Sequence, residues 1–253
     1  MHSPAIEAAN IRQTAPKLPN GEIDIEQLVL DKGWLIGHEN LKANKGRSPV
    51  MLLPMLIGGF VIRVDKQPVP KEKWEKFVKP DPEDLQRALV RYRVAKAIGQ
   101  SLFYSITPNE LPIRHSSDNL PSPTKEEKYC DQFAAALLVD PSLAAEIYNQ
   151  GPEAVVSAAN QRHVHTYAWL MAADQYQPVR AIAGWVRHNG EYLINKSSFT
   201  FNMDDGPMLW FTEPGIAHVL EANIRSGQAG PNVARHFLAF HKDNATDLIV
   251  ESM

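Results

Sequence analysis

The placement of proline constrains this chain more than any other feature of its sequence. Proline in the interior of an α-helix removes a backbone hydrogen bond and clashes with the preceding turn, so it breaks or kinks the helix. Prolines at 68, 70, 80 and 82 precede a stretch that has none, prolines at 108, 112, 121 and 123 follow it, and the next is at 141. The pattern therefore predicts two helices, over residues 82 to about 104 and 125 to about 139.

The first of these helices has a defined start and apolar residues on more than one side. Asp81 is the expected N-cap, Pro82 takes the first helical position, and Glu83 and Asp84 place negative charge in the first turn. The apolar residues that cover more than one face are Leu85, Leu89, Tyr92, Val94, Ile98, Leu102 and Phe103. This distribution predicts a helix sandwiched within the core.

The second helix has a single apolar face. Thr124 and Glu127 have the spacing of a capping box at its start. One continuous helical stripe then follows, formed by Cys130, Phe133, Ala134, Leu137 and Leu138. Because Cys130 lies in this stripe, we expect a buried structural thiol there rather than a nucleophile.

The other segments complete a mixed α+β pattern. Helical patterns are found over 24–31, 141–149, 152–161 and 165–173, and alternation within 52–65 predicts a strand or two. The proline-containing segment 105–123 resembles a loop. Two segments, 179–187 and 191–200, flank Asn189-Gly190, which is a hairpin turn signal. Beyond them we expect a strand over 209–212, helices over 215–225 and 232–241, and a last strand over 246–251.

Composition excludes several classes of protein. A single cysteine rules out an intramolecular disulfide framework and Cys-rich metal sites, and it fits a reducing compartment. The net charge of −3 provides no basic field for nucleic acid or anionic lipid. The residues up to Lys17 do not resemble a signal peptide, and the most apolar stretch, 50–64, is too short and interrupted to span a bilayer. We therefore expect a cytoplasmic protein that does not engage a membrane. Nine histidines leave a histidine-based metal site open.

The two helices predicted from the proline pattern resemble the corresponding helices of a known family. Residues 91–100 read Arg-Tyr-Arg-Val-Ala-Lys-Ala-Ile-Gly-Gln, and residues 129–138 read Tyr-Cys-Asp-Gln-Phe-Ala-Ala-Ala-Leu-Leu. The pair resembles the ImmA/IrrE family of zincin-like proteins, whose first helix carries Arg-Phe-x-x-Ala-His-Glu-x-Gly-His. The second helix of that family carries a Glu before Ala-Asn-x-Phe-Ala-Ala-x-Leu-Leu. The positions that match are Arg91, Ala95, Gly99, Phe133, Ala134, Ala135, Leu137 and Leu138.

The positions that would hold zinc in that family do not match. A zincin needs two imidazoles at i and i+4 on one helix face, with a carboxylate beside the first as general base. Here Lys96-Ala97-Ile98-Gly99-Gln100 replaces that motif, and Tyr129 stands at the place of the third ligand. We therefore expect no metal and no other cofactor, and a degenerate active-site pocket formed by Lys96, Ala97, Gln100, Glu126 and Tyr129. Lys96 would place a positive charge at the former zinc position, pairing with Glu126 or Glu127.

The resemblance also implies a division of the chain. Residues 1–20 form an N-terminal extension, and residues 21–140 form a compact zincin-like helical core with a small sheet. Residues 141–176 form a helical connector that resembles a helix-turn-helix element, with Arg162 as its strong cation. Residues 177–253 form a mixed α/β domain that looks similar to GAF-like sensory domains.

Three hypotheses about function follow. The first is a catalytically inactive zincin-like pseudopeptidase that binds a protein or small-molecule ligand as a regulatory module. The second is a repurposed metal-independent enzyme, in which burial lowers the pKa of Lys96 so that it acts as a base or Schiff-base nucleophile beside Tyr129. The third is a DNA-binding regulator that uses residues 150–175, although the helix after the turn becomes apolar.

Two groups of polar residues have a simpler interpretation. Arg87, Arg91 and Arg93, with acidic residues nearby, are typical of a solvated helix face. His163 and His165 lack a visible third partner for a metal and are typical of loop or capping histidines.

Overall fold

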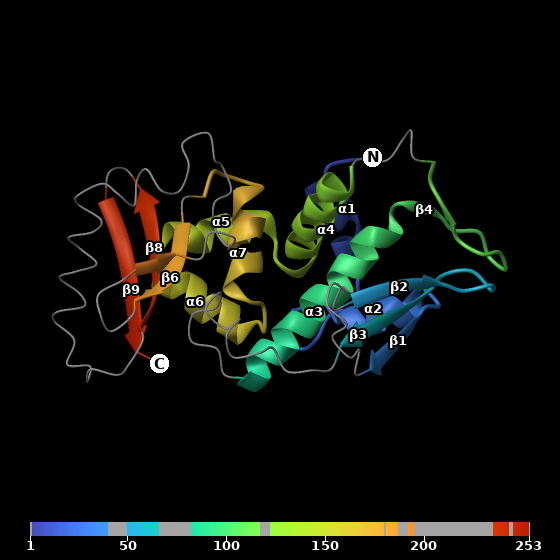
Figure 1. Ribbon diagram of the computed structural model, residues 1–253, viewed down its shortest axis with the longest axis horizontal. Helices are drawn as coiled ribbons and strands as arrows, with labels where there is room; N and C mark the ends of the chain where they lie inside the picture. Colours follow the sequence, from blue (N-terminus) through green and yellow to red (C-terminus); the bar gives the residue numbers. More distant parts are fainter. Residues whose placement is uncertain are drawn as a thin grey trace. The chain divides into compact units, whose positions relative to one another are not determined.

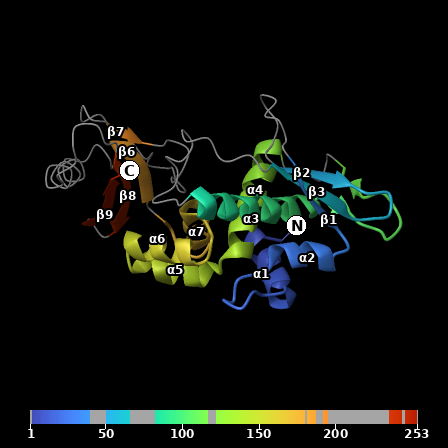
Figure 2. The ribbon, with the colours of Figure 1, turned by 90° about the horizontal axis from the view of Figure 1, so that it is seen from below.

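The computed structural model describes residues 2–39, 50–65, 82–116, 122–179, 181–186, 192–194, 235–242 and 245–252. These residues form seven helices and small sheets, so the expected mixed α+β class is confirmed. Figures 1 and 2 show the course of the chain through them. Among the described residues, none of the helices combines the length and the apolar character that crossing a bilayer demands.

The chain is divided into two compact units by its contacts. The first unit takes in Met1–Pro68, Glu83–Asp140 and the short segment Arg162–Val164. The second takes in Val69–Pro82, Pro141–Gln161 and His165–Met253. The expected division into an extension, a core, a connector and a C-terminal domain stays a prediction.

The first unit combines helices with a three-stranded sheet. In the sheet, β3 lies between β1, to which it is parallel, and β2, to which it is antiparallel. In both views α2 and α3 lie beside this sheet (Figures 1 and 2). The elements of this unit are α1 (Pro4–Thr14), α2 (Ile25–Asp31), β1 (Leu35–Glu39), β2 (Val50–Pro54), β3 (Phe60–Asp65), α3 (Pro82–Ser101), β4 (Tyr104–Ser105), β5 (Ile113–Arg114) and α4 (Pro123–Leu138).

The N-terminal helix α1 is absent from the expectations above. It begins at Ser3, whose hydroxyl oxygen accepts a hydrogen bond from the Ile6 amide, and it packs against α4. Within α1 Ala8 is fully buried, whereas the large apolar side chain of Ile6 is 52% exposed. A helix that buries one alanine leaves no apolar stripe in the sequence, so periodicity could not reveal it.

The two helices predicted from the proline pattern are confirmed as α3 and α4, but the start of α4 differs from the prediction. In α4 every residue of the expected apolar stripe is buried. Its start, however, lies two residues earlier than expected: Ser122 is the N-cap and Pro123 occupies the first turn. The expected capping box at Thr124 and Glu127 is therefore wrong, because the fixed φ of Pro123 already begins the helix.

A close approach of α3 and α4 explains Gly99. A methyl group at Gly99 would lie 2.8 Å from the Phe133 ring and 3.4 Å from the Cα atom of Cys130. The two helices therefore cross with backbone nearly against backbone at this point. Side chains on both sides of Gly99 can then reach from one helix to the other.

The described residues of the second unit form three helices and a four-stranded antiparallel sheet. The three expected helices are confirmed as α5 (Pro141–Asn149), α6 (Pro152–Gln161) and α7 (Thr166–Asp174). His165 is the N-cap of α7, because its Nδ1 accepts a hydrogen bond from the Ala168 amide at 3.0 Å. This confirms the expected capping role for His165. The sheet has the order β7-β6-β8-β9 and contains β6 (Ala181–Val186), β7 (Tyr192–Ile194), β8 (Arg235–Lys242) and β9 (Ala245–Ser252).

Of the elements expected after residue 176, the hairpin and the last strand are confirmed, and one helix is wrong. The antiparallel pairing of β6 with β7 joins Val186 to Tyr192, as the Asn189-Gly190 signal predicts, and β9 is the expected last strand. The helix expected over 232–241 is wrong, because residues 235–242 form β8, hydrogen-bonded to β6 and β9 on its two sides. The expected strand over 209–212 and helix over 215–225 lie outside the described residues.

Candidate functional site

Lys96 forms an ionic cluster between α3 and α4. Its Nζ lies 2.7 Å from Asp131 Oδ1 and 3.3 Å from Glu127 Oε1. The Tyr92 hydroxyl, one turn earlier on α3, donates a hydrogen bond to Asp131 Oδ1 at 3.0 Å. We call Tyr92, Lys96, Glu127 and Asp131 the Lys96 cluster. It joins the two helices through one ammonium and two carboxylates.

The protonation of Lys96 follows from these neighbours. Burial acts to lower the pKa of Lys96, but the charges and hydrogen bonds of Asp131 and Glu127 outweigh it and raise this pKa above its ordinary value. Lys96 is therefore a charged ammonium at neutral pH. The second hypothesis needs the pKa of Lys96 to be lowered. That expectation is wrong, because the carboxylates of Asp131 and Glu127 face the Lys96 ammonium.

Ala97 and Gln100 complete the replaced motif on α3. Ala97 is fully buried and offers a methyl group where a general base would stand. Gln100 is half-buried, and its backbone carbonyl accepts a hydrogen bond from the Phe103 amide. An ammonium, a methyl group and a neutral amide do not fit the ligand set of a zinc hydrolase.

Tyr129 contacts the N-terminal segment of the chain. Its ring packs edge-on against Phe103, with centroids 5.5 Å apart, and its hydroxyl donates to the His2 carbonyl oxygen at 3.4 Å. Burial, with contributions from the charges of Glu7 and Cys130, raises the pKa of Tyr129 to about 12. The hydroxyl therefore stays protonated at neutral pH, and a phenol with this pKa is a poor metal ligand.

Glu126 points to a different partner from the one expected. Its Oε2 lies 2.5 Å from Arg114 Nη2, so it pairs with β5 rather than with Lys96. Of the two alternatives for Lys96, the pair with Glu127 is confirmed. The structure thus distributes the expected pocket residues over three sets of contacts, around Lys96, Tyr129 and Glu126.

Cys130 is a structural residue, as its place in the apolar stripe predicts. It is fully buried, and burial is the largest cause that raises the pKa of its thiol to about 12. A thiol that remains protonated and inaccessible is not a nucleophile at neutral pH.

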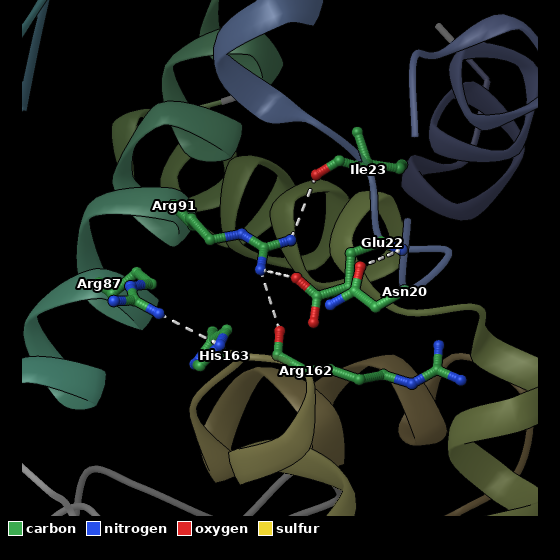
Figure 3. A network of polar contacts seen from close by, with 7 residues as sticks. All are labelled: Asn20, Glu22, Ile23, Arg87, Arg91, Arg162 and His163. Carbon is green, nitrogen blue, oxygen red and sulfur yellow. Dashed lines mark hydrogen bonds and ion pairs between the residues drawn. The ribbon is translucent and has the colours of Figure 1, made fainter. Parts of the chain in front are cut away.

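A second polar network surrounds Arg91 (Figure 3). The Arg91 guanidinium pairs with the buried Glu22 carboxylate and donates to the backbone oxygens of Arg162 at 3.0 Å and Ile23 at 3.2 Å. The Glu22 amide donates in turn to the Asn20 side chain at 3.1 Å. This network joins α3 to the segment before α2 and to Arg162–Val164, all within the first unit.

The arginine run on α3 is therefore not a uniform solvated face. Arg87 is exposed and lies 3.2 Å from His163 Nε2, but Arg91 is buried. The Arg93 guanidinium donates to the Asp65 carbonyl oxygen at 3.3 Å. The sequence does indicate that Arg91 is buried, although the prediction overlooked it. At helical spacing Arg91 lies on the same face as Val94, Ala95 and Ile98, which are all buried.

The described residues offer no arrangement for a metal or for a DNA-reading helix. No group of three or more His, Cys, Asp or Glu side chains among them could hold a metal ion. In α7 every residue is buried except the half-buried Tyr167 and Asp174, so this helix presents no cation to a phosphate.

No protein-family model matches the chain, and no curated protein matches it.

Proposed function

We propose that this chain is a catalytically inactive zincin-like pseudopeptidase that binds a protein or small-molecule ligand as a regulatory module. The proposal takes the zincin-like core from the resemblance over residues 20 to 140, and it extends to a GAF-like character for the C-terminal domain. It places the protein in the cytoplasm, in keeping with its single cysteine.

The observation that carries the proposal is the Lys96 cluster. The ammonium of Lys96 and the Asp131 carboxylate, 2.7 Å apart, join α3 to α4 where a metal joins the two helices in the resembling family. The cation is thus supplied by the chain itself. Its two carboxylate partners satisfy its charge, which favours a structural role at this position over a chemical one.

The same residues argue against hydrolysis. Ala97 stands where a general base would activate water, and no acidic or basic group can be supplied by a methyl side chain. A Schiff-base role for Lys96 needs a neutral amine, whereas Asp131 and Glu127 raise its pKa. Neither the enzyme hypothesis nor the DNA hypothesis is favoured by a specific contact of the described residues.

Metal analysis of the purified full chain tests the proposal. We expect less than about 0.1 zinc per chain after incubation with zinc and gel filtration, and no zinc-dependent rise in the melting temperature, since a bound metal would stabilise the folded state. Stoichiometric zinc in the wild-type chain would overturn the proposal.

A restored variant provides the matched control. Lys96→His, Ala97→Glu, Gln100→His and Tyr129→Glu together rebuild two imidazoles at i and i+4, a general base and a third ligand. We expect this variant to bind about one zinc per chain. A folded variant that binds none would show that α3 and α4 lack zincin geometry, and would overturn the zincin-like part of the proposal.

A further inference from the structure

Two neighbouring loops of the first unit expose an apolar surface. One is the turn between β2 and β3, and the other joins β4 to β5. The two loops lie side by side in both views (Figures 1 and 2). We call the exposed large apolar side chains of these loops and of β5 the apolar loop patch, which consists of Leu56, Ile57, Ile106, Leu111 and Ile113. The patch holds half of the large apolar side chains that are exposed in the described part of the chain.

Backbone contacts hold the two loops together. The Asn109 amide donates to the Ile57 carbonyl oxygen at 3.1 Å. Gly58 has a φ of +86°, and a Cβ atom there would lie 2.9 Å from the Thr107 carbonyl oxygen, so the turn packs directly on the second loop. The patch is therefore formed before any partner arrives, and binding to it costs little conformational entropy of the backbone.

The apolar side chains of the turn cannot withdraw into the core. Directly after the turn, Phe60 is fully buried, and the rings of Trp34 and Tyr104 pack edge-on against it with centroids 5.0 and 5.2 Å away. Aromatic rings already fill this space. Leu56 and Ile57 thus remain 79% and 71% exposed. Clustered apolar side chains that stay in solvent are typical of a site of protein contact.

Charges of opposite sign flank the apolar loop patch. Glu110 is the only charged residue in segments 55–59 and 106–113, and its side chain is exposed. Among the described residues no cation pairs with this carboxylate. Arg114, on the other side of Leu111 and Ile113, is also exposed. Its Nη2 lies 2.5 Å from Glu126 Oε2, and the guanidinium has further N–H donors for a second acceptor.

From this arrangement we infer that the apolar loop patch is a self-association surface, whose occupant is the same patch of a second copy of the chain. In a two-fold interface one surface faces itself, so a residue that contacts a second residue across the interface is contacted by it in return. Aliphatic side chains then meet aliphatic side chains, and Glu110 of each copy faces Arg114 of the other. A surface flanked by both signs of charge is complementary to itself, whereas a partner or lipid layer of a single sign would match only half of it.

This self-association goes beyond the proposed function and does not depend on it. The apolar loop patch contains neither a residue of the Lys96 cluster nor a position of the replaced zinc motif. Zinc content and oligomeric state are also measured separately. A patch of five aliphatic side chains belongs to the class of small interfaces, so we expect a reversible dimer rather than an obligate one.

Sedimentation velocity of the purified full chain tests the inference. Between about 1 and 300 μM we expect a monomer–dimer equilibrium with a dissociation constant of about 10–100 μM. Leu56→Asp combined with Ile113→Asp places carboxylates within the patch and should weaken the dimer about tenfold or more. Both side chains are exposed, so the melting temperature should change little. Leu35→Asp, at an exposed apolar position of β1 outside the patch, is the matched control and should leave the dissociation constant unchanged.

A charge-swapped pair of chains tests the two-fold arrangement. One chain carries Glu110→Arg, and the other carries Arg114→Glu together with Glu126→Gln, which removes the carboxylate that residue 114 faces in its own chain. Each chain alone brings like charges together across the interface and should dimerise about five- to tenfold more weakly than the wild type. An equimolar mixture joins opposite charges at both contacts, so its affinity should return toward the wild-type value.

Three results would overturn the inference. The first is a wild-type chain that stays monomeric up to about 300 μM, including one that instead cosediments with vesicles of phosphatidylcholine and phosphatidylserine. The second is a dimer that Leu56→Asp with Ile113→Asp leaves intact, because the copies would then meet through another surface. The third is a charge-swapped mixture that associates no better than its two chains do alone.

Discussion

Two cations on α3 are held by carboxylates that differ in burial. Arg91 is buried, as is its partner Glu22, so each charge has lost most of its water and depends on the other. Lys96 is partly exposed, and one of its partners, Glu127, lies largely in solvent. Removing one member of the first pair should therefore cost more than removing one member of the second.

Replacing Arg91 should be strongly destabilising. Arg91→Met leaves the Glu22 carboxylate buried without its cation and leaves two backbone oxygens without their donor, so we expect the free energy of unfolding to fall by about 3–5 kcal/mol. Urea unfolding followed by circular dichroism measures the loss. Arg87→Met, at an exposed position of the same helix, should cost about 1 kcal/mol or less. Equal losses for the two variants would contradict the assignment of Arg91 to the core.

The Lys96 cluster should show a measurable coupling energy. Lys96→Met and Asp131→Asn each remove one side of the closest pair, while Tyr92 can still donate to residue 131. In a double-mutant cycle we expect a coupling of about 1–2 kcal/mol, smaller than for a fully buried pair. The cycle of Lys96→Met with Glu127→Gln should give less, because Glu127 is exposed. A coupling near zero for Asp131 would show that the pair does not stabilise the helix contact.

The Cys130 thiol predicts a dependence of stability on alkaline pH. Its pKa is about 12 in the folded chain and about 8.5 when unfolded, so the unfolded state loses its proton first as pH rises. The stability linked to this thiol is present below pH 8.5 or so and declines as pH rises toward 12. Between pH 7 and 10 the wild type should lose roughly 2 kcal/mol relative to Cys130→Ala. A stability difference that stays constant over this range would contradict the burial of an un-ionised thiol.

At the scale of elements, proline and periodicity predict helix bounds well. The expected bounds of α5 and α6 agree with the structure because each begins at a proline, and α3 begins at Pro82 for the same reason. The strand β8 shows the limit of such reasoning. Phe237, Phe240 and His241 have helical spacing, but residues 235–242 pair with β6 and β9 along both edges, and this pairing overrides local preference.

The close crossing of α3 and α4 predicts that adding one methyl group at Gly99 destabilises the protein. Gly99→Ala places its Cβ 2.8 Å from the Phe133 ring, inside a packed core, and should lower the free energy of unfolding by about 1–3 kcal/mol. Adding Phe133→Leu should recover part of this loss by making room. Gly37→Ala, whose Cβ would meet its nearest atom at 3.8 Å, should change stability by about 0.5 kcal/mol or less. Thermal unfolding of the three variants distinguishes a tight crossing from a general intolerance of substitution.

At the scale of the whole molecule, the first unit is not a continuous piece of chain. It includes Arg162–Val164, so its network around Arg91 is completed by residues that follow α6 in the sequence. A boundary drawn after Asp140 from motifs alone would separate Arg91 from the Arg162 carbonyl oxygen.

A fragment that ends at Asp140 should therefore be less stable than the same residues in the full chain. It lacks the Arg162 acceptor and the His163 ring that Arg87 contacts, and we expect a loss of about 1–3 kcal/mol. Hydrogen exchange of α3 amides, compared between fragment and full chain, measures it. His163→Ala in the full chain, which removes the exposed contact but keeps the Arg162 carbonyl, should have the smaller effect. Identical protection in fragment and full chain would contradict this role for residues 162–164.

The sequence by itself determined the α+β class, the bounds of most helices and the buried face of α4. Prolines, caps and apolar periodicity act within a few residues, so they can be interpreted without knowing what lies across the core. The tertiary structure alone decided which partners the charges take: Glu22 for Arg91, Asp131 for Lys96, and Arg114 for Glu126. Those partners come from other elements or segments of the chain, and their burial, rather than their local pattern, decides whether a charge is solvated or structural.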